Sequence, residues 1–322
     1  MDIAAIRELI ADDLTAIDKV ILKRLKSDVV LINQIGAHIV YSGGKRMRPL
    51  IVLLAARAFG YKGDKHIELA AVVEFIHTAT LLHDDVVDES DKRRNKDTAN
   101  ALWGNSASVL SGDFLYSRSF EMMVDVGIMR VLDILSHASN QIAEGEVLQL
   151  LNCNNPEATE EEYMKVIYRK TATLFEAGAK IGAVLVNGTA EEEASMADYG
   201  RHLGTAFQLI DDVMDYSSSS EEMGKNVGDD LAEGKPTLPL IRAMEQGTAE
   251  QKAFIQSAIE NGGLDQIDAV TEAIKSTDAI EYTAKVAERE ASKAKGALAF
   301  LPTSPYRDAL ISLVDLSVKR SS

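Results

Sequence analysis

The sequence is poor in the residues that build disulfide frameworks, zinc sites and loop-rich folds. It contains one cysteine, Cys153, and 6 prolines among 322 residues. A single cysteine cannot form an internal disulfide, and no His/Cys spacing typical of a zinc site is present, so neither device is expected to stabilise this protein. Low cysteine use also fits a reducing compartment, and we expect a cytoplasmic protein.

Long apolar runs and an excess of basic residues are absent as well. No run of about 18 apolar residues occurs, so no transmembrane segment is predicted, and residues 1–8 lack the basic and apolar regions of a signal peptide. With 34 basic and 50 acidic residues the formal net charge is −16, so neither nucleic acid nor an anionic membrane surface is an expected partner. Hydrophobic residues make up 46% of the chain, which is enough for a large core.

Most of the sequence has helical periodicity. Apolar residues recur at three- and four-residue spacing, and convincing alternating strands are absent. Several helix starts are visible as capping boxes or as a serine followed by proline: Thr159 with Glu162, Thr189 with Glu192, Thr248 with Gln251, and Ser304-Pro305. We therefore expect one all-α domain over residues 1–322, a helical bundle without an interior linker or a repeat.

Two acidic pentads share the pattern Asp-Asp-x-x-Asp, each within an apolar, helix-like stretch. They are Asp84-Asp85-Val86-Val87-Asp88 and Asp211-Asp212-Val213-Met214-Asp215. On a helix the first and last aspartates of a pentad share a face, where like charges repel and desolvation is costly. A solvated acidic helix start would explain one copy, but two copies indicate a compensating cation. Mg2+ fits best, because it is a hard ion that binds one or two carboxylates together with substrate phosphates.

Basic residues gather in short motifs suited to phosphate oxygens. Adjacent glycines before Lys45 and Arg48 let the backbone approach an anion closely, and arginine adds bidentate geometry. The Gly-x4-Gly-Lys-Ser/Thr pattern of a P-loop is missing. For Arg46, Lys92 and Arg169 we expect ordinary surface charges. The candidate motifs are Gly43-Gly44-Lys45-Arg46-Met47-Arg48-Pro49, Arg93-Arg94, Lys170-Thr171, Lys225 and Lys235.

Residues 89–95 and 217–236, which follow the two pentads, have loop-like composition. Loops beside a reaction site are candidate lids. His77 lies seven residues before Asp84, two helical turns away on roughly the same face, and this placement favours a substrate role for it. His83 lacks that support, and we expect it to be structural.

Taken in order, these motifs resemble those of the trans-isoprenyl diphosphate synthases. The resemblance runs from about residue 40 to 240, and it rests on the Gly43–Pro49 motif, His77, both pentads and the basic residues beside them. It implies an isoprenoid-synthase bundle around a central cavity, a homodimer, and a Mg2+-dependent prenyltransferase. The substrates implied are isopentenyl diphosphate and an allylic prenyl diphosphate such as farnesyl diphosphate, and the use implied for a long polyprenyl product is ubiquinone side-chain synthesis.

The resemblance also implies a role for each motif residue. Mg2+ ions that bridge the allylic diphosphate would be held by Asp84, Asp85, Asp88, Asp211, Asp212 and Asp215. The same diphosphate would contact Arg93, Lys170, Lys225 and Lys235. Isopentenyl diphosphate would be bound by Lys45, Arg48, His77 and Arg94, and the reacting centre would be lined by Thr171 and Gln208. Asp85 is the least secure ligand, because it points about a third of a turn away from Asp84.

Product length depends on the depth of the cavity below the first pentad. The residues one turn before it, Ala79 and Thr80, are small. In the family that this chain resembles, a bulky aromatic there blocks the growing tail, so the small pair predicts a long product, of about octaprenyl length.

Three other classes of protein stay open on the sequence alone. A terpene cyclase also uses an aspartate-rich helix, but its second metal motif is usually of Asn/Ser/Glu type, and it needs no Lys45/Arg48 set. A non-catalytic partner subunit often loses motif residues, and none is missing here. A metal-buffering or interaction protein would bind Mg2+ without requiring diphosphate.

Overall fold

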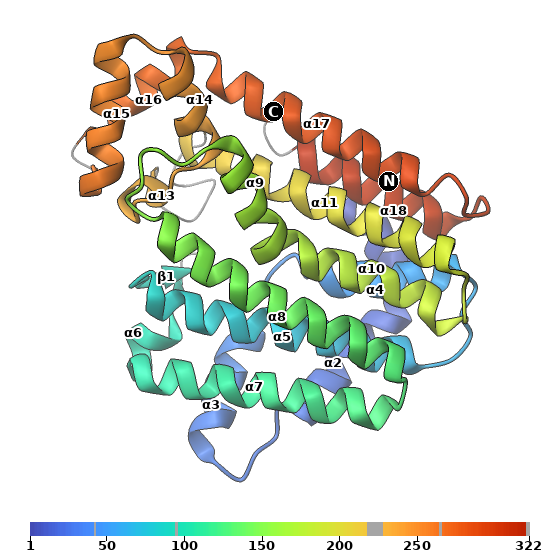
Figure 1. Ribbon diagram of the computed structural model, residues 1–322. Helices are drawn as coiled ribbons and strands as arrows, with labels where there is room; N and C mark the ends of the chain where they lie inside the picture. Colours follow the sequence, from blue (N-terminus) through green and yellow to red (C-terminus); the bar gives the residue numbers. More distant parts are fainter. Residues whose placement is uncertain (42, 94–95, 218–227, 264–265, 320–322) are drawn as a thin grey trace. The chain divides into compact units, whose positions relative to one another are not determined.

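The computed structural model describes residues 1–41, 43–93, 96–217, 228–263 and 266–319, and nearly all regular structure in these ranges is helical (Figure 1). The all-α fold expected from the sequence is confirmed. The helices of the first half are α1 (Ile3–Leu9), α2 (Ala11–Arg24), α3 (Val30–Tyr41), α4 (Met47–Ala58), α5 (Lys65–Val87), α6 (Ala99–Trp103), α7 (Asn105–Val126) and α8 (Met129–Asn152).

The second half of the chain continues the same pattern. It contains α9 (Glu160–Ile167), the π-helix η1 (Tyr168–Ala172), α10 (Thr173–Leu185), α11 (Ala190–Ser217), α13 (Asp229–Ala232), α14 (Leu238–Gln246), α15 (Ala249–Asn261), α16 (Ile267–Ser276), α17 (Ala279–Ala297) and α18 (Pro305–Val318). The four helix starts read from the sequence are confirmed by their capping hydrogen bonds.

Two short strands follow the first pentad. β1 (Lys92–Arg93) pairs antiparallel with β2 (Lys96–Asp97). The sequence predicted an irregular loop here, and the difference is small because each strand has two residues. No helix within the described ranges is long and apolar enough to cross a membrane.

The chain forms two compact units. Unit 1 comprises Met1–Ser139, Leu174–Gly200 and Ala297–Leu313, and unit 2 comprises Asn140–Thr173, Arg201–Gly296 and Val314–Ser322. The first pentad therefore belongs to unit 1 and the second to unit 2. The single domain over residues 1–322 stays a prediction.

Unit 1 is built around α5, which packs against α2, α4 and α7. Residues 69–73 of α5 have no exposed surface, as expected for a helix surrounded by others. Gly182 of α10 permits a close approach to α4, because a Cβ there would lie 2.6 Å from the Cβ of Ala55. The small residues that the sequence shows in both helices thus serve close helix packing.

A charged cluster is buried among α2, α4 and α5 in unit 1. Arg57 donates to both carboxylate oxygens of Asp13, at 2.8 Å from Nε and 2.5 Å from Nη2, and His66 Nε2 lies 3.3 Å from Asp13. Burial alone would raise the pKa of Asp13, but the contacts with His66 and Arg57 lower it to about 2. Asp13 is therefore ionised over the whole neutral and mildly acidic range.

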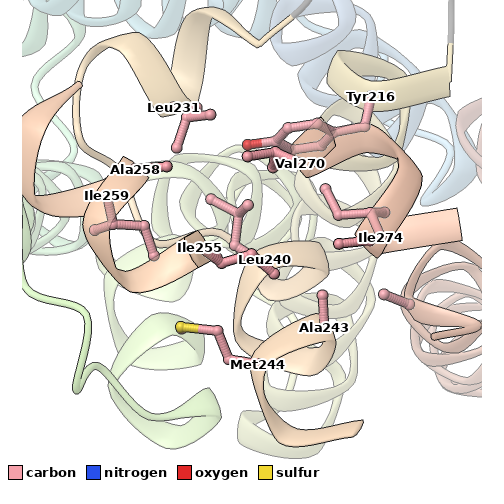
Figure 2. Close-up of a cluster of buried hydrophobic side chains, with 12 residues drawn as sticks. Tyr216, Leu231, Leu240, Ala243, Met244, Ile255, Ala258, Ile259, Val270 and Ile274 are labelled. Atoms are coloured by element: carbon pink, nitrogen blue, oxygen red, sulfur yellow. The ribbon is translucent and has the colours of Figure 1, made fainter. Parts of the chain in front are cut away.

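Unit 2 has its own apolar core, formed largely by α14, α15 and α16. Figure 2 shows Tyr216 of α11 packed among these helices, beside Leu231 of α13 and Val270 of α16. Tyr216 directly follows Asp215, so this core fixes the end of α11 that carries the second pentad.

Candidate active site

The first pentad forms the last turn of α5. The backbone N–H of Asp88 donates to the carbonyl of Asp84 at 2.8 Å, and the helix ends there. Asp84 and Asp88 are half-buried, whereas Asp85 is buried. A helix C-terminus is already the negative end of the helix dipole, so three carboxylates at this position favour the binding of a cation.

Arg93 is held by the middle aspartate of the first pentad. Its Nε donates to Asp85 Oδ1 at 2.8 Å, and its Nη2 lies 2.7 Å from the same oxygen. Burial raises the pKa of Asp85, against the opposing effect of the Arg93 charge. The loop is fixed further by Asn100, whose amide donates to the carbonyls of Asp85 and Ser90. Arg93 is thus held next to the first pentad by contacts within unit 1.

Two residues predicted to bind isopentenyl diphosphate are in contact. Arg48 Nη1 lies 3.1 Å from His77 Nε2, and the Arg48 guanidinium stacks 4.6 Å from the ring centroid of Phe175. Stacking on an aromatic face orients the planar guanidinium. Phe175 could not be singled out from the sequence, because an aromatic residue in an apolar helix is ordinarily part of the core.

The glycine turn before α4 has the backbone geometry that its composition implies. Gly43 and Gly44 have φ of 70° and 147°, a region that favours glycine. Lys45 is exposed, and Arg46 forms an ion pair with Asp18 of α2. Arg46 therefore has a structural partner on the surface.

His83 links two helices, as expected of a structural histidine. Its Nε2 lies 3.1 Å from the carbonyl of Val109 and 3.3 Å from Asp113 Oδ1, both in α7. The chain-length residues lie on the same helix: Ala79 is buried with 1% of its surface exposed, and Thr80 Oγ1 donates to the carbonyl of His77.

The second pentad lies near the C-terminal end of α11. Asp211 is half-buried, whereas Asp212 and Asp215 are buried. Both carboxylate oxygens of Asp212 accept protein hydrogen bonds, from Tyr163 Oη at 2.5 Å and from Gln208 Nε2 at 2.8 Å. Burial and the nearby charge of Asp230 raise the pKa of Asp212 well above its ordinary value.

Lys170 and Thr171 lie on the π-helix η1, a local widening of the helix that is frequent at functional sites. Lys170 Nζ lies 2.7 Å from Glu146 Oε2 of α8, and Thr171 Oγ1 donates to Gln208 Oε1 at 3.0 Å. Gly145 of α8 permits this segment to lie close, because a Cβ there would be 2.7 Å from the backbone N of Lys170.

Lys235 lies between the second pentad and α14, directly after Gly234, whose backbone contacts Asn154. Its Nζ pairs with Glu233, and the backbone N–H of Asn154 donates to the carbonyl of Gly234 at 2.8 Å. The remaining predicted contacts, Arg94 and Lys225, lie outside the described residues.

Within the described ranges, no three or more His, Cys, Asp or Glu side chains gather closely enough to hold a metal ion by themselves. In proteins generally, Mg2+ binds few carboxylates and completes its octahedron with substrate oxygens and water. The donors at the two pentads are carboxylate oxygens, and they fit a hard divalent cation.

The carboxylates of the two pentads and the ion-paired basic side chains near them agree with the prenyltransferase activity that the sequence motifs predict, and the comparisons with known proteins show that class of enzyme. The chain belongs to the polyprenyl synthetase family, whose sequence profile matches residues 29–277. It is similar to octaprenyl diphosphate synthase of Escherichia coli strain K12, with 57% identity over 321 residues, covering 99% of both chains. The octaprenyl diphosphate synthase of Haemophilus influenzae is 52% identical over 322 residues, covering 100% of this chain and 98% of that protein.

Solved structures agree over the full chain. Polyprenyl synthase from Caulobacter crescentus CB15, complexed with calcium and isoprenyl diphosphate, is 42% identical with a TM-score of 0.96, covering 100% of this chain and 98% of that one. A decaprenyl diphosphate synthase from Rhodobacter capsulatus is 43% identical with a TM-score of 0.94, covering 100% of both.

Proposed function

We propose that the protein is a long-chain trans-polyprenyl diphosphate synthase that adds isopentenyl units to an allylic diphosphate such as farnesyl diphosphate. The full-length identity to octaprenyl diphosphate synthases carries this proposal. We further propose octaprenyl diphosphate as the main product, action in the cytoplasm and use of the product in ubiquinone side-chain synthesis.

Mg2+ is the proposed cofactor. Asp84 and Asp88 of the first pentad, and Asp211 and Asp215 of the second, supply hard oxygen donors at helix ends. The middle aspartates, Asp85 and Asp212, complete the two acidic groups. When bound, Mg2+ neutralises the diphosphate leaving group and acts as a Lewis acid. The calcium of the Caulobacter crescentus structure is a divalent cation in that protein and supports this choice.

The cations of the site are proposed to bind the two diphosphates. Arg93 and Lys170 would bind the allylic diphosphate, and both are ion-paired with carboxylates that hold them in place. Lys235 and Lys225 would join them. Arg48 and His77, already in contact at 3.1 Å, would bind isopentenyl diphosphate with Lys45 and Arg94.

The reaction then follows from the substrates. The allylic C–O bond breaks, the double bond of isopentenyl diphosphate attacks the carbocation, and the released diphosphate takes the proton. Thr171 and Gln208, hydrogen-bonded to each other at 3.0 Å, are proposed to line this centre. Ala79 and Thr80 are proposed to leave room for a long product tail. Exclusion of water is required, because the carbocation would otherwise be quenched.

Two further expectations accompany the assignment. The family profile covers parts of both units, which supports a single functional domain over residues 1–322. A homodimer is proposed, and exposed apolar residues of α7 such as Leu110 and Val124 support it.

The product distribution tests the function. Purified protein would be incubated with farnesyl diphosphate, labelled isopentenyl diphosphate and Mg2+, and the dephosphorylated products would be resolved. A dominant octaprenyl product that disappears with EDTA is expected. A cyclised hydrocarbon would favour a cyclase, and no turnover unless a second protein is added would favour a partner subunit. Tight Mg2+ binding without diphosphate would favour a metal-buffering protein.

A further inference from the structure

Asp212 differs from its neighbour Asp211 in what surrounds its carboxylate. Only 2% of Asp212 is exposed, and each of its oxygens accepts a hydrogen bond from a side chain of unit 2. Asp211 is half-buried, one residue earlier on α11. Adjacent residues of a helix point about 100° apart. The Asp212 side chain therefore faces the protein interior, whereas the Asp211 side chain is partly exposed.

Tyr163 holds Asp212 from a different helix. Its ring belongs to an apolar cluster with Ile167, Leu209 and Leu238, so packing fixes the ring and aims the hydroxyl at the carboxylate 2.5 Å away. A hydrogen bond to a carboxylate inside a protein is stronger than one between neutral groups. The position of Asp212 is therefore set by the core of unit 2.

The same carboxylate sets the position of two residues assigned to the reacting centre. Asp212 Oδ1 accepts from Gln208 Nε2 at 2.8 Å, so the amide must turn its oxygen the other way, where it accepts from Thr171 Oγ1 at 3.0 Å. The chain of bonds runs from α9 through α11 to the π-helix. Each group in it has one consistent donor or acceptor role.

We propose that Tyr163 is a positioning residue and that Asp212 is its partner in this role: the pair fixes Gln208 and Thr171, and Asp212 does not ligate a metal ion. The inference rests on the proposed function, and it deepens it by assigning the metal-binding role to Asp211 and removing it from Asp212.

The first experiment separates ligation from positioning. Asp211→Asn and Asp212→Asn would be compared in Mn2+ titrations with inorganic diphosphate present, following free Mn2+ by electron paramagnetic resonance. Asn at 212 can accept from Tyr163 and donate to a turned Gln208 amide, which then donates to Thr171, so the chain of bonds survives. We expect Mn2+ affinity to fall about tenfold or more for Asp211→Asn and to stay at the wild-type value for Asp212→Asn.

The second experiment tests Tyr163 with a matched control. Tyr163→Phe keeps the ring in its apolar cluster and removes only the hydroxyl, and Tyr199→Phe removes the hydroxyl of another buried tyrosine, which donates to the Leu310 carbonyl at 2.9 Å in unit 1. We expect kcat to fall about 10- to 100-fold in Tyr163→Phe, with the KM for isopentenyl diphosphate and the Mn2+ affinity unchanged. Tyr199→Phe is expected to lower the melting temperature and leave kcat intact.

The results that would overturn the roles of Tyr163 and Asp212 differ from the result that would overturn the proposed function. Loss of Mn2+ affinity in Asp212→Asn comparable to that in Asp211→Asn would overturn the assignment. So would wild-type kcat in Tyr163→Phe, or equal losses of kcat in both tyrosine variants. If the wild-type protein formed no prenylated product at all, the proposed function would fail, and the Mn2+ titrations alone would still decide whether Asp212 is a ligand.

Discussion

At the residue scale, the two pentads share one feature: their second aspartate is buried and accepts a hydrogen bond from another part of the same unit. The first two aspartates of each pentad are adjacent on a helix and point about 100° apart. In both pairs the second aspartate is buried and the first is half-buried, and a side chain from elsewhere in its unit donates to the buried one: Arg93 to Asp85, and Tyr163 to Asp212. A buried carboxylate without donors would be costly, so these partners make the motif compatible with the folded state.

Replacing Ala79 by tyrosine tests the proposal that a cavity for the product tail lies below the first pentad. Ala79 has 1% of its surface exposed and lies on α5 about one turn before Asp84. A tyrosine ring would occupy space proposed for the product tail, and overpacking would cost about 1–3 kcal/mol of stability. We expect the Ala79→Tyr product to shorten to farnesyl or geranylgeranyl length in a chain-length assay. Ala79→Ser is the control that should keep the long product, and an unchanged product from the tyrosine variant would refute the cavity account.

Asp13 makes the free energy of unfolding of unit 1 depend on pH. A carboxyl pKa lowered from 3.8 to about 2 in the folded state corresponds to about 2 kcal/mol. Because the folded pKa is the lower one, this contribution is fully present above about pH 4 and disappears as the pH falls toward 2. We expect Asp13→Asn to be less stable than wild type by this amount at pH 6 in urea unfolding, with the gap closing between pH 4 and 2.

Asp18→Asn serves as the control for that measurement. Asp18 pairs with Arg46 at the surface, where its side chain is 56% exposed, and exposed ion pairs contribute about 0–1 kcal/mol. A gap between wild type and Asp13→Asn that stayed constant down to pH 2 would show that the Asp13 pKa is not lowered on folding.

At the element scale, the π-helix η1 is the least regular part of the helical structure and carries Lys170 and Thr171. Gly145 of α8 faces it, and a Cβ at this position would lie 2.7 Å from the Lys170 backbone N and 2.8 Å from the Arg169 Cβ. We expect Gly145→Ala to displace η1 and to reduce kcat about 100-fold, since misplacement by about 1 Å can have that effect. Steady-state kinetics would measure it.

Gly296→Ala is the matched control on another helix. A Cβ at Gly296, near the end of α17, meets no atom within 4 Å, so alanine should raise stability by about 0.5–1 kcal/mol through helix propensity and leave kcat unchanged. Wild-type kcat in Gly145→Ala would mean that the position of η1 does not matter for catalysis.

Helix starts could be predicted from sequence because their signals are local. Thr159 and Glu162 form the capping box that their spacing implies, with bonds of 2.9 and 3.2 Å. The π-helix could not be predicted, since no local sequence signal marks it and its close neighbour Gly145 lies on another helix. Tyr163 was missed for the same reason: one tyrosine in a helix carries no signal of a carboxylate 49 positions away.

At the scale of the whole molecule, the basic residues of the motifs lie in a chain whose net charge is strongly negative. The chain carries −16 overall, which disfavours the approach of diphosphates. The motif cations Arg93, Lys170 and Lys235 are nonetheless paired with carboxylates inside their units, so phosphate oxygens would replace existing partners. Sequence motifs revealed these cations, but their acidic partners are set by the fold, and Glu146 and Glu233 gave no signal of their own.

The remaining prediction concerns the oligomer. Leu110 and Val124 of α7 are 66% and 67% exposed, and fourteen residues apart they lie on roughly the same face of the helix. We expect sedimentation equilibrium to give twice the mass of the 35.0 kDa chain, because large exposed apolar side chains are common where the copies of a permanent dimer meet. The double variant Leu110→Glu/Val124→Glu would place two carboxylates per copy in that interface and should yield monomers. Leu22→Glu changes a leucine on α2 that is 52% exposed, outside α7, and should stay dimeric. A monomeric wild-type protein would refute the homodimer, whereas a dimeric double variant would refute only the assignment of α7 to its interface.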